Sequence, residues 1–310
     1  MATYLLPAIY VVGAWWLSTG LALRAVGIAG RAPRPSMAAA AGLFCVALAA
    51  LAATAPDASP AAAYIAFTAA LAVWGVQEVA FLAGWITGPW RQASPIGIGA
   101  WSRARYAVAA ILHHELALAA SGLAIVAATW NGANQIGAWT FAVLFGMRIS
   151  AKLNVFLGVP NVTEGFLPTH LGHLKSFFGR KPMNLLFPVS VSASTVLLAA
   201  LAAAAAGADG ADATGLTLLA TLVGLALLEH WFLVLPIPIE ALWAWGQSGA
   251  EAAPDDPVDS DAGAQVLRLT PRASGQLARA SGERRATAGG GPRLVHDTTQ
   301  ERLEGAASWP

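Results

Sequence analysis

Apolar residues fill most of the chain in blocks of about 20, separated by short polar stretches, up to about residue 235. A block of this length crosses the hydrocarbon core of a bilayer as an α-helix. The pattern therefore predicts an all-α, polytopic membrane helix bundle. Its seven transmembrane helices are expected over residues 5–28, 37–55, 62–87, 106–129, 136–157, 185–206 and 216–235.

The loops between these helices alternate in charge. The first, third and fifth loops are basic, whereas the second and sixth carry only aspartate and the fourth carries no charge. Because Lys and Arg are retained on the cytoplasmic side, the odd loops are expected in the cytoplasm. The amino terminus is then outside and the carboxyl terminus inside. The basic residues are Arg31, Arg34, Arg91, Arg103, Arg105, Lys175, Arg180 and Lys181.

The chain changes character after the last apolar block. Residues 247–310 are rich in Ala, Gly, Asp and Arg, with an acidic patch around Asp255 and a basic stretch from Arg268 to Arg293. Too few large apolar side chains are present to offset the entropy of ordering. We therefore expect a transmembrane helical domain over 1–246 and a disordered cytoplasmic tail over 247–310.

Composition narrows the class of protein further. Hydrophobic residues make up 56% of the chain and charged residues 11%, which is too little charge for a typical soluble domain. The net charge of +1 gives no basis for binding nucleic acid. Cys45 is the only cysteine, which excludes an intramolecular disulfide and a cysteine-based zinc site. Tryptophans near predicted helix ends, including Trp243 and Trp245, suggest an interfacial aromatic belt.

Ionisable residues interrupt four of the predicted helices. With a rise of 1.5 Å per residue, most of them lie about 9–14 Å from the cytoplasmic helix ends, so they share one depth. A charged group in mid-membrane costs roughly 2.5–3.5 kcal/mol on insertion scales, so such groups usually pair, bind a ligand or line a wet cavity. We call this set the polar layer: Glu78, His113, His114, Glu115, Arg148, Lys152, Glu229 and His230.

One interpretation of the polar layer is a metal site. Carboxylates and imidazoles from several helices of a bundle are typical ligands of di-iron or di-manganese centres. His170 and His173 in the fifth loop, spaced i and i+3, are expected to add ligands from below. The predicted ligand set is Glu78, His114, Glu115, His170, His173, Glu229 and His230, and no residue is assigned a catalytic role.

Two other interpretations remain open. The carboxylates could pair with Arg148 and Lys152, giving a charge-balanced core that only specifies helix packing. Alternatively, one or two imidazoles could ligate the magnesium of a pigment or the iron of a haem. His113 and His114 would then be the ligands, with Trp74 stacking on the ring.

A family resemblance rests on a long run around the fifth loop. It reads KLNVFLGVPN from Lys152, EGFLPTHLGHLKSFF from Glu164 and RKPMNLLFPVS from Arg180. Together with HHELA at 113–117, this run resembles the PuhE family of photosynthetic complex assembly proteins from anoxygenic phototrophic bacteria. The resemblance spans most of residues 4–246 and leaves the tail unaccounted for.

The resemblance implies a cellular context rather than a reaction. Members of that family are associated with assembly of the reaction centre–light-harvesting complex and with bacteriochlorophyll supply in the inner or intracytoplasmic membrane. Reaction-centre or light-harvesting subunits and pigment-synthesis proteins are thus the expected partners. The alternative function is a membrane di-iron or di-manganese oxidase or hydroxylase acting on a tetrapyrrole or isoprenoid through the polar layer.

Overall fold

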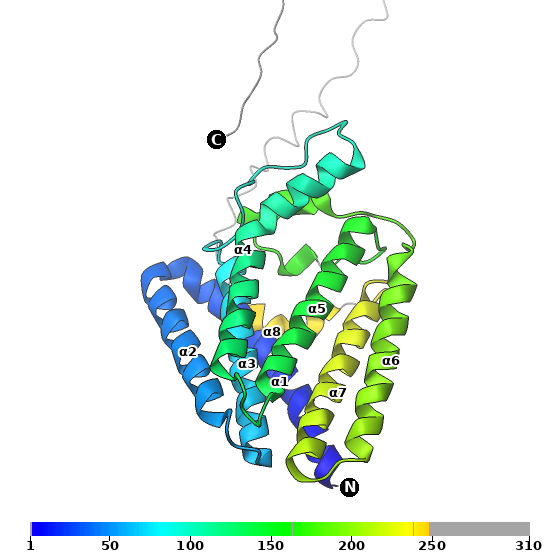
Figure 1. The fold of residues 1–310 in the computed structure, drawn as a ribbon. Coiled ribbons are helices and arrows are strands. Elements are labelled where there is room, and N and C mark those ends of the chain that lie inside the picture. Colours follow the sequence, from blue (N-terminus) through cyan, green and yellow to red (C-terminus); the bar gives the residue numbers. More distant parts are fainter. Residues whose placement is uncertain (1, 163, 238, 248–310) are drawn as a thin grey trace, which may run out of the picture. The chain divides into compact units, whose positions relative to one another are not determined.

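A computed structural model describes residues 2–162, 164–237 and 239–247 and shows a bundle of helices (Figure 1). Seven helices are long and apolar enough to cross a membrane, as the sequence predicts. Within the described residues all regular structure is helical. Except for Gln247, the predicted disordered tail lies outside the described residues, and which side of the membrane each end faces stays a prediction.

The observed helices follow the predicted spans closely. Two short 3₁₀ helices, η1 (Glu164–Phe166) and η2 (Thr169–Phe177), lie between α5 and α6, and η3 (Ile239–Trp243) and the short α8 (Ala244–Gln247) follow α7. The long helices are α1 (Ala2–Arg31), α2 (Pro33–Thr54), α3 (Pro60–Leu82), α4 (Ala100–Ala128), α5 (Ile136–Leu157), α6 (Leu186–Ala206) and α7 (Gly210–Phe232).

Local chemistry sets several helix ends. Proline occupies the first turn of α2 and α3, where its missing N–H is not needed. The Ser59 hydroxyl caps α3 by accepting a hydrogen bond from the Ala62 N–H at 3.2 Å. α3 ends at Leu82, five residues before the predicted end at Thr87. Gly84, with φ of 77°, turns the chain there, and such a conformation favours glycine.

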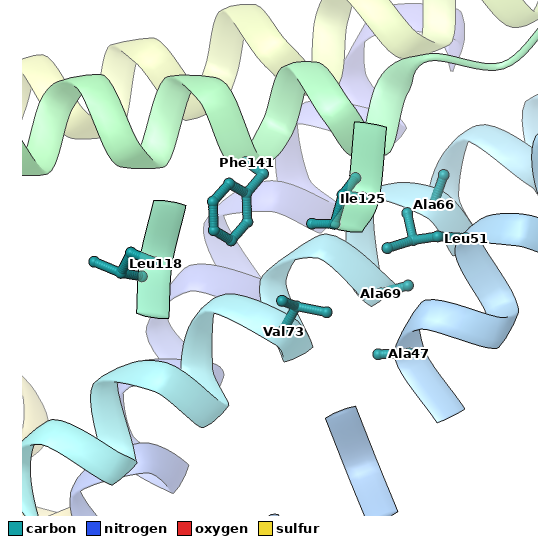
Figure 2. Close-up of a cluster of buried hydrophobic side chains, with 8 residues drawn as sticks. All are labelled: Ala47, Leu51, Ala66, Ala69, Val73, Leu118, Ile125 and Phe141. Carbon is teal, nitrogen blue, oxygen red and sulfur yellow. The ribbon is translucent and has the colours of Figure 1, made fainter. Parts of the chain in front are cut away.

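Small side chains let α2, α3, α4 and α5 approach closely. Figure 2 shows their meeting point, where Leu118 and Ile125 of α4 and Phe141 of α5 face Val73 of α3. The α2 and α3 sides of this cluster consist mainly of alanines around Leu51. Without a hydrophobic driving force between helices in lipid, such close packing holds the bundle together.

α3 and α7 are the two central helices. They have the largest buried share among the seven spans, and α1 packs against both of them. A second apolar cluster joins them through Phe67 of α3, Leu218 and Leu222 of α7 and Val11 of α1. Gln77 of α3 and His230 of α7 are therefore buried between helices, whereas Glu229 of α7 is exposed.

Tryptophans attach the segment after α7 to the first helix. We call η3 and α8, residues 239–247, the C-terminal strap. Trp243 Nε1 donates to the Trp16 carbonyl at 2.9 Å, and Trp16 Nε1 donates to the Leu242 carbonyl at 3.0 Å. The Trp245 ring lies against Gly20, where a Cβ would overlap it. Trp243 and Trp245 therefore pack against α1, and the interfacial belt stays a prediction.

Candidate functional site

The polar layer is held together by two ion pairs that cross between helices. Arg148 of α5 donates from Nη2 to Glu78 Oε2 of α3 at 2.9 Å. Lys152, one turn further along α5, donates from Nζ to Glu115 Oε1 of α4 at 2.5 Å. α5 therefore supplies both cations, at i and i+4, to carboxylates on its two neighbours. Two of the predicted metal ligands are in fact partners of cations.

His114 is completely buried beside the first ion pair. Its Nε2 lies 3.8 Å from Glu78 Oε1, which is beyond hydrogen-bonding distance. Within the described residues, neither ring nitrogen of His114 has a hydrogen-bond partner, and Glu78 Oε1 has none either. The ring of His114 lies against that of Phe81 with centroids 4.4 Å apart. His114 and Glu78 thus form a close pair of buried polar groups with unused hydrogen-bonding capacity.

The segment after α3 fixes the position of His114. Its Thr87 carbonyl accepts a hydrogen bond from the His114 backbone N–H at 3.0 Å, and the Trp90 N–H donates to the Ala109 carbonyl at 3.4 Å. A Cβ on Gly88 would overlap the backbone of α4 here. Non-helical backbone at membrane depth is tolerated only where it is packed in protein. Glycine 88 therefore permits the close contact that aligns α4.

Glu229 of α7 has an aromatic partner instead of a cation. Its Oε1 accepts a hydrogen bond from Trp15 Nε1 of α1 at 2.7 Å. The Trp15 ring in turn contacts Trp243 of the C-terminal strap, edge to face, with centroids 5.0 Å apart. Sequence reasoning missed Trp15, because hydropathy places a tryptophan in a span without showing which way it faces.

His230, next to Glu229, uses both ring nitrogens within the bundle. Nε2 lies 2.9 Å from the Ser150 hydroxyl of α5, and Nδ1 lies 2.8 Å from the Ala226 carbonyl. The Ser150 hydroxyl donates a hydrogen bond to the Ser190 hydroxyl of α6 at 2.9 Å. The Ser190 hydroxyl also accepts one from the Asn154 amide at 3.1 Å. These residues form a polar seam joining α5, α6 and α7. In this arrangement both ring nitrogens of His230 have hydrogen-bond partners, so neither is free to ligate a metal.

His170 and His173 lie on η2, which packs against the end of α3 and against residues 106–111 of α4. Leu171, Leu174 and Phe177 of η2 form a cluster with Phe81 and Ala110. His170 is exposed and lies beside Gly84. Burial lowers the pKa of His173 below its ordinary value of 6.5, so the neutral imidazole is favoured. η2, which carries the loop histidines, therefore packs against the two helices that carry Glu78 and His114.

The two adjacent histidines of α4 face opposite environments. His114 is buried, whereas His113 is exposed on the outer side of the helix. Trp74 is half-buried and packs against the apolar cluster of α2, α3, α4 and α5, edge to face with Phe141 and with ring centroids 5.4 Å apart. Trp74 therefore packs with Phe141 beside the core, and its stacking on a ring ligand stays a prediction.

The geometry favours pairing over a shared metal centre. In the part of the chain that the structure describes, no three His, Cys, Asp or Glu side chains gather closely enough to hold one ion. Glu78 and Glu115 pair with cations, Glu229 binds an indole, and His230 is hydrogen-bonded on both sides. The predicted iron or manganese cluster stays a prediction, and the ion-pair interpretation describes the contacts that are present.

Comparison with known proteins identifies relatives of unknown function. The profile of a family described as "Protein of unknown function (DUF3623)" matches residues 1–253. An uncharacterized 30.4 kDa protein in the puhA 5′ region of Rhodobacter capsulatus is 40% identical over 245 residues, covering 77% of this chain and 89% of the relative. No solved structure matches. The puhA 5′ region is the neighbourhood of PuhE, so the resemblance seen in the sequence is confirmed.

Proposed function

This chain belongs to the DUF3623 family, and from its similarity to a protein of the puhA region we propose that it is an assembly factor for photosynthetic complexes in a bacterial membrane. It binds newly made reaction-centre or light-harvesting subunits and supports bacteriochlorophyll supply or insertion. The membrane is the inner or intracytoplasmic membrane of a phototrophic bacterium. Pigment-synthesis proteins are the further partners.

The observation that carries this proposal is the genetic position of the relative. A protein 40% identical to this chain over most of its length lies in the puhA region of a photosynthesis gene cluster. Genes for the assembly of one complex are commonly grouped in bacteria. The extent of the match, 89% of the relative, supports a shared role for the whole membrane domain.

The contacts inside the bundle support a scaffold. Lys152–Glu115 and Arg148–Glu78 tie α5 to α4 and to α3, and the His230 seam ties α5 to α6 and α7. Each pair specifies which helix faces which, as buried polar groups do in some bundles. A fixed bundle leaves its outer apolar faces available to other transmembrane helices.

The proposal is tested by affinity purification from a phototrophic bacterium that carries this gene. A tagged chain is recovered in mild detergent shortly after pulse labelling of new proteins. We expect reaction-centre or light-harvesting subunits to co-purify while newly labelled and to leave during a chase, because an assembly factor binds its clients transiently. A tagged unrelated seven-helix protein serves as the control.

Two results would contradict the assembly role. One is that labelled subunits are recovered no more than with the control protein. The other is that subunits remain bound throughout the chase, which describes a permanent component of the complex.

A further inference from the structure

His113 is a polar side chain on a face of α4 that is otherwise apolar. Among the exposed residues of α4 between 106 and 128, the others are Val108, Leu116, Ala119, Ala120, Leu123, Val126 and Ala127. It lies about 10 Å along the helix from Tyr106, well inside the predicted span. Within the described part of the chain, no hydrogen bond, ion pair or ring contact reaches its imidazole.

An imidazole exposed toward lipid needs a partner. Ionisable residues in membrane spans are rare and almost always face the bundle interior or a ligand pathway. The neighbouring His114 and Glu115 follow that rule, since one is buried and the other pairs with Lys152. The exception at His113 therefore points to a ligand that approaches from outside the bundle.

The surroundings of His113 restrict the chemistry of that ligand. A bare metal ion needs several protein ligands, but the exposed face of α4 offers one nitrogen. A metal held there must bring its own equatorial ligands, as the metal of a tetrapyrrole does. Such a ring is flat, so the side chains around the ligating nitrogen must be small. The side chains one helical turn to either side of His113 are small, since they belong to Ala109 and Ala117.

We propose that His113 is the axial ligand to the magnesium of a chlorin pigment held on the outer face of α4. The choice of a magnesium chlorin over haem rests on the proposed function, because photosynthetic complexes carry such pigments. The apolar side chains Leu116 and Ala120 then contact the ring and its hydrocarbon tail. His114 is fully buried, with Phe81 and Glu78 beside it, and leaves no room for a macrocycle.

Pigment binding by the full-length chain in detergent tests this assignment. Bacteriochlorophyll a is added to purified protein, and pigment absorbance is measured in the protein peak after size-exclusion chromatography. We expect about one pigment per chain, and at least a tenfold loss in His113→Leu. Leu123→Ala, at another exposed position of α4 about 15 Å further along the helix, is the matched control and should retain the pigment. The magnesium-free bacteriopheophytin a should bind no better to wild type than to His113→Leu.

A second variant separates ligation from an effect on folding. His113→Gly should lose the pigment and recover it when free imidazole is added, since imidazole replaces the missing ligand. Equal binding of bacteriochlorophyll by wild type and His113→Leu would overturn the assignment. It would also be overturned if wild type bound the magnesium-free pigment as well as it binds bacteriochlorophyll. Preferential binding of haem would also overturn it. Because these readouts use pigment alone, they are independent of whether photosynthetic subunits co-purify.

Discussion

Lys152 and Glu115 lie at a depth where water is scarce, so the charge of each depends on the other. Their side chains are only 24% and 23% exposed, and they join α5 to α4. Taking two charges out of water is unfavourable, and the pair is tolerated because the charges compensate each other. At the scale of residues, the polar layer is therefore sensitive to the loss of one partner.

Replacing Glu115 by Gln should destabilise the bundle. The change leaves the Lys152 ammonium without its anion, and breaking a buried pair costs about 3 kcal/mol or more. Unfolding by sodium dodecyl sulphate from mixed micelles, followed by circular dichroism, measures the difference in free energy. The double variant Glu115→Gln/Lys152→Met should regain most of it, because no charge is then unpaired. Equal stability of wild type and Glu115→Gln would show that the pair contributes nothing.

The stability of the fifth loop should depend on pH through His173. Burial lowers the pKa of His173, so the folded loop binds a proton less readily than the unfolded chain. The contribution of neutral His173 to the stability of the folded loop is complete above the ordinary histidine pKa of 6.5. It is lost as the pH falls below that value, because the unfolded chain then binds a proton more readily. The loss is at most about 1.4 kcal/mol per pH unit. Hydrogen exchange of η2 at pH 7.5 and 5.5 measures it, and His173→Phe should show no such dependence.

At the scale of elements, the C-terminal strap connects α1 to the polar layer. Trp243 contacts Trp15, and Trp15 donates to Glu229. The strap therefore packs against Trp15, the residue that binds Glu229. In the polar layer, Glu78 and Glu115 pair with cations, whereas Glu229 accepts a hydrogen bond from this indole. The contact of the strap with α1 depends on the absence of a side chain at Gly20, against which Trp245 lies.

Replacing Gly20 by Leu should displace the strap from α1. The new side chain would occupy the position of the Trp245 ring, whereas a Cβ at Gly13 on the same helix meets no atom within 4 Å. Gly13→Leu is therefore the matched control. Limited proteolysis between Leu235 and Gln247 should be several-fold faster in Gly20→Leu than in the control. Identical cleavage rates would mean that the strap is not held by this contact.

The sequence predicts the elements better than their contacts. All seven spans are predicted, with ends that differ from the observed ones by at most six residues, because hydropathy depends on length and composition, which the bilayer dictates. The predicted third span extends past Leu82 because residues 83–87 remain mostly apolar, whereas the turn depends on Gly84. Depth along a helix can be calculated from the rise per residue, so the members of the polar layer could be grouped in advance.

Pairing within the layer could not be predicted in the same way. Adjacent helical residues differ by about 100° in direction, and hydropathy does not determine how each helix is rotated. His113, His114 and Glu115 illustrate this, since they face the lipid side, α3 and α5 respectively. The strap tryptophans were equally ambiguous, because a belt and a packed cluster have the same composition.

At the scale of the whole molecule, charged pairs fix the helices from within while apolar faces point outward. Glu78 of α3 is largely buried and paired with Arg148, whereas α4 presents His113 on its outer surface. This division suits a protein that keeps one shape while other membrane components bind to its exterior. The same division distinguishes the two candidate functions. An assembly factor would bind other proteins on its outer surface, whereas an oxidase would carry out its reaction at the polar layer inside the bundle.

Deletion of the gene in a phototrophic bacterium tests the proposed function most directly. Membranes are analysed for assembled reaction centre–light-harvesting complex and, by chromatography, for tetrapyrrole and isoprenoid intermediates. An assembly factor predicts several-fold less assembled complex with no new intermediate, and recovery when the wild-type gene is restored. Accumulation of one defined biosynthetic intermediate, or an unchanged amount of assembled complex, would contradict the assembly role.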